Sequence, residues 1–175
     1  MTDHTATAEK VKDAKLGAKN LRKISIFAYL NEPELESLYS LGEIQTYKPK
    51  ANIVIEGEPS RGLFVIVSGT VSVYKKDSNS SQLIRLSYLE DGGFFGELSL
   101  FDDAPRTATI TAESACSCLF LDHAAFHNFL DTKGDNLKAR FYQKCAEEMT
   151  ERFRTQNTDY IVSQHLLWKY ALRKE

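Results

Sequence analysis

The spacing of hydrophobic residues divides the chain into zones of different predicted structure. Residues 1–20 carry apolar side chains too sparsely to bury a face, so we expect this segment to be disordered or a frayed helix. In residues 21–41 the apolar positions fall at helical spacing. Asn31 followed three residues later by Glu34, with Pro33 between them, is a helix-start pattern. The sequence therefore predicts one or two short helices before the main body.

Residues 44–121 follow a different rhythm, in which turn residues break short apolar runs at intervals of roughly 8 to 12 residues. This spacing is typical of a sandwich or barrel. Ser68 and Gly69, between two β-branched runs, predict a tight hairpin turn, because glycine adopts positive φ without steric strain. The expected strands cover residues 53–55, 63–67, 71–74, 83–88, 107–112 and 116–121.

After residue 121 the pattern is helical again. Asp122 is expected to cap a helix over 124–130, and Gly134 to end it. Five apolar residues then recur at intervals of four, which predicts a long amphipathic helix that is interrupted at 157–159 and followed by a last helical segment. These five are Leu137, Phe141, Cys145, Met149 and Phe153. We expect an α+β fold, an antiparallel, jelly-roll-like β-roll of about eight strands flanked by N-terminal and C-terminal helices.

Composition and charge narrow the function classes. The 175 residues include 22 Lys and Arg against 24 Asp and Glu, a net charge of −2, so we expect no nucleic-acid partner. The longest apolar run, 63–67, is far shorter than the roughly 20 residues that span a bilayer, and residues 1–20 hold no signal-peptide core. We therefore expect a cytoplasmic protein with no membrane contact. Three cysteines in no zinc-ligand spacing favour reduced thiols.

The candidate chemistry lies in residues 95–110, which read FGELSLFDDAPRTATI. A short helix beginning near Glu97 or Leu98 would offer the N–H groups of Glu97, Leu98 and Ser99 to an anion. Gly96 would let that anion approach the backbone. Arg106 is suited to a bidentate, charge-assisted contact with a phosphate.

This stretch resembles the phosphate-binding cassette of cyclic nucleotide-binding domains, and segments 55–58 and 63–71 resemble the early strands and glycine turns of that family. The resemblance covers roughly residues 21–155. It implies that Glu97 accepts a hydrogen bond from the ribose 2′-hydroxyl and that Arg106 binds the phosphate, with Pro105 fixing the turn before it. The hydroxyl of Thr107 permits cyclic GMP, yet bacterial relatives with a hydroxyl at this place prefer cyclic AMP. We therefore expect cyclic AMP rather than cyclic GMP.

The same resemblance implies a binding module rather than an enzyme, with no cofactor beyond the nucleotide. We expect a member without an attached effector domain, which relays binding through its C-terminal helices to an unidentified effector protein; a homodimer through these helices is an alternative. Residues 21–155 would form the nucleotide-binding domain and 156–175 a helical extension. The helix after the roll should supply a lid over the base. Phe141 and Tyr142 are candidates, unless they belong to the core.

Two other functions stay open. A ligand-free scaffold of the same fold usually lacks the arginine or the glutamate, whereas this chain has both Arg106 and Glu97. A cupin-like metalloenzyme needs about three His or Glu ligands on its barrel strands, and none of the four histidines lies between residues 44 and 121. His123 and His127 have metal-ligand spacing but no third ligand nearby in the sequence. We therefore predict neither a metal site nor a catalytic residue.

Overall fold

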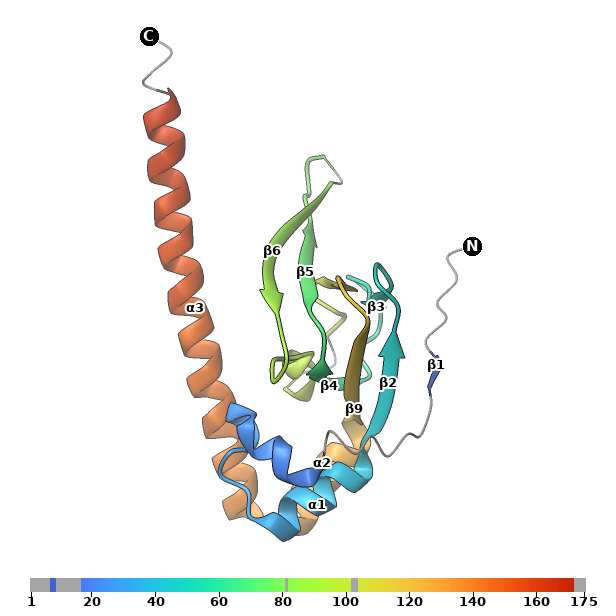
Figure 1. Cartoon of the computed structure of the whole chain (residues 1–175). Coiled ribbons are helices and arrows are strands. Elements are labelled where there is room, and N and C mark those ends of the chain that lie inside the picture. Colours follow the sequence, from blue (N-terminus) through green and yellow to red (C-terminus); the bar gives the residue numbers. More distant parts are fainter. Residues whose placement is uncertain (1–6, 9–16, 81, 102–103, 172–175) are drawn as a thin grey trace.

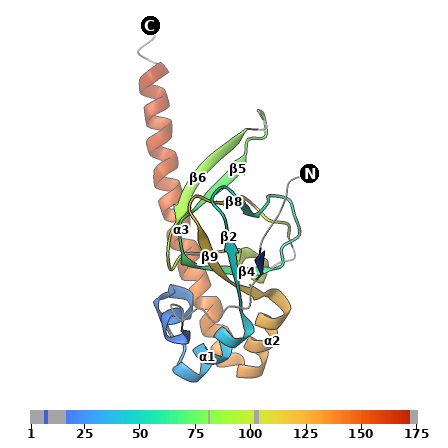
Figure 2. The same cartoon turned by 45° about the vertical axis from the view of Figure 1, so that its right-hand side comes forward.

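The computed structural model describes residues 7–8, 17–80, 82–101 and 104–171. Two antiparallel sheets form a β-roll, with short helices packed below it and one long helix along its side (Figures 1 and 2). The expected fold class is therefore confirmed. Of the segment 1–20, Thr7–Ala8 forms a short strand and Ala18 begins a 3₁₀ helix, while residues 1–6 and 9–16 lie outside the description.

The described strands form one sheet of five, in the order β1-β2-β9-β4-β7, and one of four, in the order β3-β8-β5-β6. Three of these strands, β1, β2 and β7, were not among the expected ones, because β1 and β7 are only two residues long and β2 buries few apolar residues. The bounds are β1 (Thr7–Ala8), β2 (Glu43–Tyr47), β3 (Asn52–Val54), β4 (Gly62–Ser68), β5 (Val71–Lys76), β6 (Leu83–Leu89), β7 (Phe94–Phe95), β8 (Thr109–Ala112) and β9 (Cys116–Asp122).

The predicted hairpin at Ser68 and Gly69 is wrong. β4 pairs with β7 and β9, whereas β5 pairs with β6 and β8, so the turn between β4 and β5 crosses from one sheet to the other. The turn is held by the next crossing loop, where the Glu113 N–H donates to the Thr70 carbonyl at 2.8 Å. Gly69 has φ +99°, and a Cβ there would lie 2.6 Å from the Ala115 carbonyl oxygen. Glycine is therefore needed at position 69 because two loops pack closely there.

Two hydrophobic cores share the strand β4. Leu63 and Val65 point into the core between the roll and the helices, while Phe64 and Ile66 point into the core between the two sheets. Because a strand buried on both faces needs apolar residues at every position, residues 63–66 show no polar alternation.

Short helices close the lower end of the roll. These are η1 (Ala18–Lys23), η2 (Ser25–Phe27), α1 (Glu32–Leu41) and α2 (His123–Lys133). The predicted start of α1 is confirmed as a capping box: the Glu34 N–H donates to Asn31 Oδ1 at 2.9 Å, and the Asn31 N–H donates to Glu34 Oε2 at 2.8 Å. The predicted cap of α2 is also confirmed, because Asp122 Oδ1 accepts from the Ala125 N–H at 3.1 Å.

The long helix α3 (Asp135–Ala171) passes beside the roll and extends beyond it (Figure 1). The predicted interruption is wrong, because α3 continues through the Asn-Thr-Asp triplet; these residues are weak helix formers but none breaks a helix as proline does. The predicted apolar stripe divides in two. Leu137, Phe141 and Cys145 are buried against the other helices, whereas Met149 and Phe153 are 37% and 63% exposed. Among the residues of α3 whose burial the structure describes, only those in its first part are buried in the core.

Phe141 is the main anchor of α3. Its side chain is fully buried, with its ring centre 6.5 Å from that of Phe27 and 4.9 Å from that of Phe126. The alternative that this aromatic belongs to the core is therefore the correct one, and Phe141 is not the lid.

We predict that Phe141→Ala lowers the free energy of unfolding by about 3 to 5 kcal/mol, because it leaves a cavity in the core. Phe153→Ala, on the exposed part of the same helix, should change it by no more than about 0.5 kcal/mol. Urea unfolding of both variants measures these changes. Equal losses would show that Phe141 does not anchor the helix.

Candidate functional site

The stretch 95–110 closes one end of the roll. It leaves β7, forms the one-turn helix η3 (Glu97–Leu100), and enters the other sheet at β8. The residues predicted to bind a ligand therefore lie in a crossing between the two sheets.

Gly96 allows two parts of this crossing to approach closely. It has φ +84°, in the left-handed region that favours glycine, and caps η3. A Cβ at this position would lie 2.4 Å from Arg106 Nη1 and 2.7 Å from the Gly62 carbonyl oxygen. The glycine thus makes room for the guanidinium of Arg106, as well as for the turn.

Arg106 is held from several sides. Its N–H donates to the Glu58 carbonyl at 2.8 Å, and its own carbonyl accepts from the Gly57 N–H at 2.9 Å. Its Nη2 donates to the Gly62 carbonyl at 2.9 Å, and its Cζ lies 5.6 Å from the ring centre of Phe64. The side chain is therefore fixed in one position before any ligand arrives.

The Arg106 guanidinium is buried yet only partly satisfied. The residue is 8% exposed, and neither Nε nor Nη1 has a hydrogen-bond partner among the described residues. Burial lowers the pKa of Arg106 and the nearby carboxylate of Glu97 raises it, but an arginine stays protonated. A buried cation with unused donors is unfavourable unless a further acceptor completes it. The arrangement is suited to an anion that presents oxygens to Nε and Nη1.

Glu97 is already engaged by a residue that the sequence did not indicate. Arg152, on α3, contacts Glu97 Oε1 through Nη1 at 2.7 Å and donates from Nη2 to the Phe94 carbonyl at 3.2 Å. Its Cζ lies 4.4 Å from the ring centre of Phe94. The side chain of Glu97 is 13% exposed and that of Arg152 is 36% exposed, so this pair is partly sheltered from water. It is the polar link between the cassette and the long helix.

The remaining predicted residues lie nearer the surface. Leu98, Pro105 and Thr107 are exposed, and Ser99 lies in η3 with its side chain outside the description. The Thr107 carbonyl accepts from Lys75 Nζ at 2.7 Å, and Lys75 also pairs with a glutamate at 2.6 Å. The fold therefore brings Gly96, Glu97 and Arg106 together, and places the others around them.

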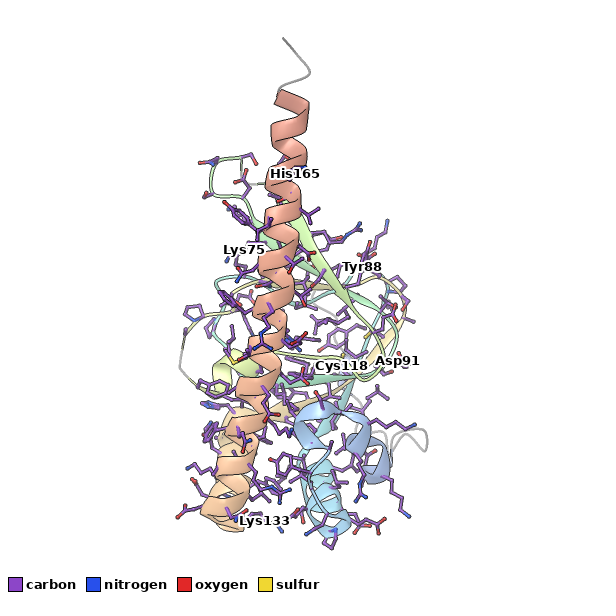
Figure 3. The ribbon with its side chains drawn as sticks, turned by 90° about the vertical axis from the view of Figure 1, so that its left-hand side faces the viewer. Lys75, Tyr88, Asp91, Cys118, Lys133 and His165 are labelled. Carbon is purple, nitrogen blue, oxygen red and sulfur yellow. The ribbon has the colours of Figure 1, made fainter. Side chains whose placement is uncertain are left out.

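The strand β6 carries several exposed apolar side chains. Leu83, Ile84, Leu86 and Tyr88 of β6 are at least half exposed, and α3 passes beside this strand (Figures 1 and 3). Tyr142, the other candidate for a lid, is partly buried against Phe101, with ring centres 5.6 Å apart. It too belongs to the helix packing.

The two histidines of α2 contact each other. The ring centres of His123 and His127 lie 4.4 Å apart, and His127 Nε2 is 3.2 Å from the Leu100 carbonyl oxygen. Within the described ranges, no three His, Cys, Asp or Glu residues gather closely enough to hold a metal. Cys116 and Cys118 are buried free thiols on one face of β9, as expected. None of the helices in the described ranges is long and apolar enough to cross a membrane.

A β-roll that holds a buried arginine with open donors defines a domain for binding an anionic ligand. The chain belongs to the cyclic nucleotide-binding domain family, whose model matches residues 44–133. The resemblance in the sequence is thereby confirmed.

The chain is 35% identical over 107 residues to the cAMP-activated global transcriptional regulator CRP of Salmonella typhimurium, a match covering 61% of this chain and 50% of the relative. It thus spans about half the length of the curated relatives it matches. A cyclic nucleotide-binding domain from Methylobacillus flagellatus has a TM-score of 0.71 at 23% identity, covering 81% and 79% of the two chains. The regulatory domain of Toxoplasma gondii PKA, solved with cAMP, has 0.64 at 20%, covering 74% and 48%. These structures show the shared fold.

The relatives correct one expectation from the sequence. The curated relatives are transcriptional regulators, a class that acts on nucleic acid, so the expectation of no nucleic-acid partner is wrong. That expectation rested on the net charge of −2, which sums charges of both signs over this chain. Such a sum says nothing of what a regulator built around a ligand-binding roll acts on.

We predict that Gly96→Ala is more destabilising than Gly92→Ala. Both glycines have φ +84°, but a Cβ at Gly92 meets nothing within 4 Å, whereas at Gly96 it meets Arg106 and Gly62. The shared strain is about 1 to 2 kcal/mol, and the overlap at Gly96 should add about 1 to 3 kcal/mol. Urea unfolding checks this difference; equal losses would contradict the close approach of Arg106.

Proposed function

We propose that the chain binds a cyclic mononucleotide, cyclic AMP rather than cyclic GMP, and acts as a regulatory sensor without catalytic activity. The observation that carries this proposal is the buried Arg106 guanidinium with two unused donors. The cyclic phosphate supplies acceptor oxygens for those donors, since phosphate oxygens match the planar fork of arginine. The choice of cyclic AMP is supported by the relatives that are activated by it or were solved with it.

The ribose lies at Glu97 in this proposal. Its 2′-hydroxyl donates to the Glu97 carboxylate, which already accepts from Arg152. The nucleotide therefore either joins this ion pair or displaces Arg152 from it. In both cases the ligand changes the contact that links the cassette to α3.

The base extends between β6 and α3. Met149 and Phe153 on α3, close to Arg152 in the sequence, are exposed apolar side chains, and Leu86 on β6 is exposed as well. Met149 precedes Arg152 by three positions and so shares its helix face. A planar base stacked against these side chains removes apolar surface from water, which makes Phe153, rather than Phe141, the proposed lid.

The output of the sensor is a change in α3. Its first part is anchored by Phe141, and the part beyond Cys145 has few buried side chains. A ligand that interacts differently with two positions of this outer part shifts the balance between them. The relatives make regulation of transcription the process that we propose for this response.

We predict that cyclic AMP stabilises the chain against heat through Arg106. Ligand at a hundred times its dissociation constant adds about 2.7 kcal/mol of stability. Arg106→Lys keeps the charge but loses the fork, so its affinity should fall about ten- to a hundredfold. Arg154→Lys, an exposed arginine of α3, is the matched control and should bind normally.

Calorimetric titration with cyclic AMP and cyclic GMP measures these affinities. If neither nucleotide binds at millimolar concentration, the proposal is wrong. Equal affinity of Arg106→Lys and the parent would exclude Arg106 as the phosphate contact.

A double-mutant cycle tests the Glu97–Arg152 link. Glu97→Gln and Arg152→Gln, singly and together, should give a coupling free energy of about 1 kcal/mol without nucleotide, because the pair is only partly sheltered. Saturating cyclic AMP should bring the coupling toward zero if the ribose displaces Arg152. The exposed pair Glu151 and Arg154 is the control, with coupling near zero throughout. Coupling that nucleotide leaves unchanged argues against displacement.

A further inference from the structure

A hollow of about 850 Å³ opens at the edge of the roll formed by β2 and β3. Its walls come from these two strands, the loop between them, and the turn that precedes β4. Among the described residues that line it, Arg106 is the sole member of the predicted cassette set, and α3 contributes none. Its volume lies in the range of small-molecule pockets, roughly 300 to 1,000 Å³. Glu97, the proposed ribose contact, is not among the lining residues.

Positive charge predominates around the hollow. Lys48, Lys50, Arg61 and Arg106 line it, against the single carboxylate of Glu58. The local excess of positive charge contrasts with the net charge of −2 for the whole chain. None of the ion pairs in the described ranges involves Lys48, Lys50 or Arg61. These cations are available to an anionic ligand.

The inner wall of the hollow is aromatic. Tyr47, Phe64 and Phe120 line it, and the ring centres of Phe64 and Phe120 lie 4.8 Å apart. Ile53 and Val54 of β3, packed against the same core cluster, add apolar surface. Aromatic walls with a few charged groups at the mouth are typical of sites that bind a flat ring with a polar end.

The backbone at the rim is fixed in place. The Lys50 N–H donates to the Ala112 carbonyl at 2.6 Å, and the Ala51 carbonyl accepts from the Ala112 N–H at 2.9 Å. The loop that carries Lys48 and Lys50 is thereby tied to β8. The backbone that carries these cations is thereby held beside the hollow before binding, which reduces the entropy lost on binding.

We infer that this hollow is a second ligand site, for a small aromatic anion with a phosphate or carboxylate group. The ring lies against Tyr47 and Phe120, and the anionic group lies among Lys48, Lys50 and Arg61. Arg106, buried and with unused donors, forms the boundary between this site and the cassette. The inference goes beyond nucleotide binding and does not depend on it.

Calorimetric titration of the whole chain with phenyl phosphate tests the site, with inorganic phosphate and benzyl alcohol as probes that carry one feature each. Phenyl phosphate should bind at least about tenfold more tightly than either, since it uses both the cations and the aromatic wall. The double variant Lys48→Ala/Lys50→Ala should bind it about tenfold more weakly. Lys133→Ala, at the end of α2 (Figure 3) and not among the lining residues, should bind phenyl phosphate as the parent does.

Three results would overturn the inference: no binding of phenyl phosphate at millimolar concentration, equal binding of inorganic phosphate, or binding that the Lys48→Ala/Lys50→Ala change leaves intact. The last would place the probe at the cassette alone. Cyclic AMP titrated in parallel separates the two proposals, because Glu97→Gln should weaken cyclic AMP and leave phenyl phosphate unchanged. Loss of phenyl phosphate binding therefore does not imply loss of cyclic AMP binding, and the reverse also holds.

Discussion

The arrangement of the site depends on one buried cation. The Arg106 guanidinium is removed from water, yet two of its donors have no partner among the described residues. A group of this kind is retained only when the fold over-determines its position, and here Gly96, the Gly62 carbonyl and the turn at 57–58 do so together. The resulting arrangement is unfavourable without an anion and complete with one. In the proposed function, ligand binding and the stability of the roll are therefore directly linked.

The second constraint is the ion pair between Glu97 and Arg152. It joins a one-turn helix in the roll to a helix whose core contacts end near Cys145. The outer part of α3 has few buried side chains among the described residues, so this ion pair supplies a large part of what holds it. A modest change at the pair therefore affects this part of the helix strongly. The same carboxylate is the group that a ribose hydroxyl would contact. In the proposed function, sensing and response thus meet at the side chain of Glu97, through which a small ligand would act on α3.

Much of the fold follows from local sequence patterns. The capping box at Asn31, the cap at Asp122 and the uninterrupted apolar strand at 63–66 are short-range features, and each was predictable. The cassette was predictable as well, since Gly96, Glu97 and Arg106 lie within one segment. The turn at Gly69 was not, because a hairpin and a crossing between sheets place the same demand on its backbone.

Contacts between residues far apart in the chain could not be predicted from the sequence. Arg152 lies 55 residues from Glu97 and reads as one more solvated arginine on a helix. Phe141 and Phe153 occupy the same stripe, so periodicity could not tell the core residue from the proposed lid. Net charge misled in another way, because it averages away both the buried Arg106 and the cations around the hollow.

The central claim is that the Arg106 guanidinium binds a phosphate through its unused donors. It is tested most directly by following the side-chain Nε–H signal of Arg106 in ¹⁵N–¹H NMR spectra. Cyclic AMP should shift this signal strongly and slow its exchange with water, since the proton enters a charge-assisted hydrogen bond. Adenosine, which has the base and ribose but no phosphate, should leave it unchanged. An unchanged signal with cyclic AMP, or the same change with adenosine, would contradict the account.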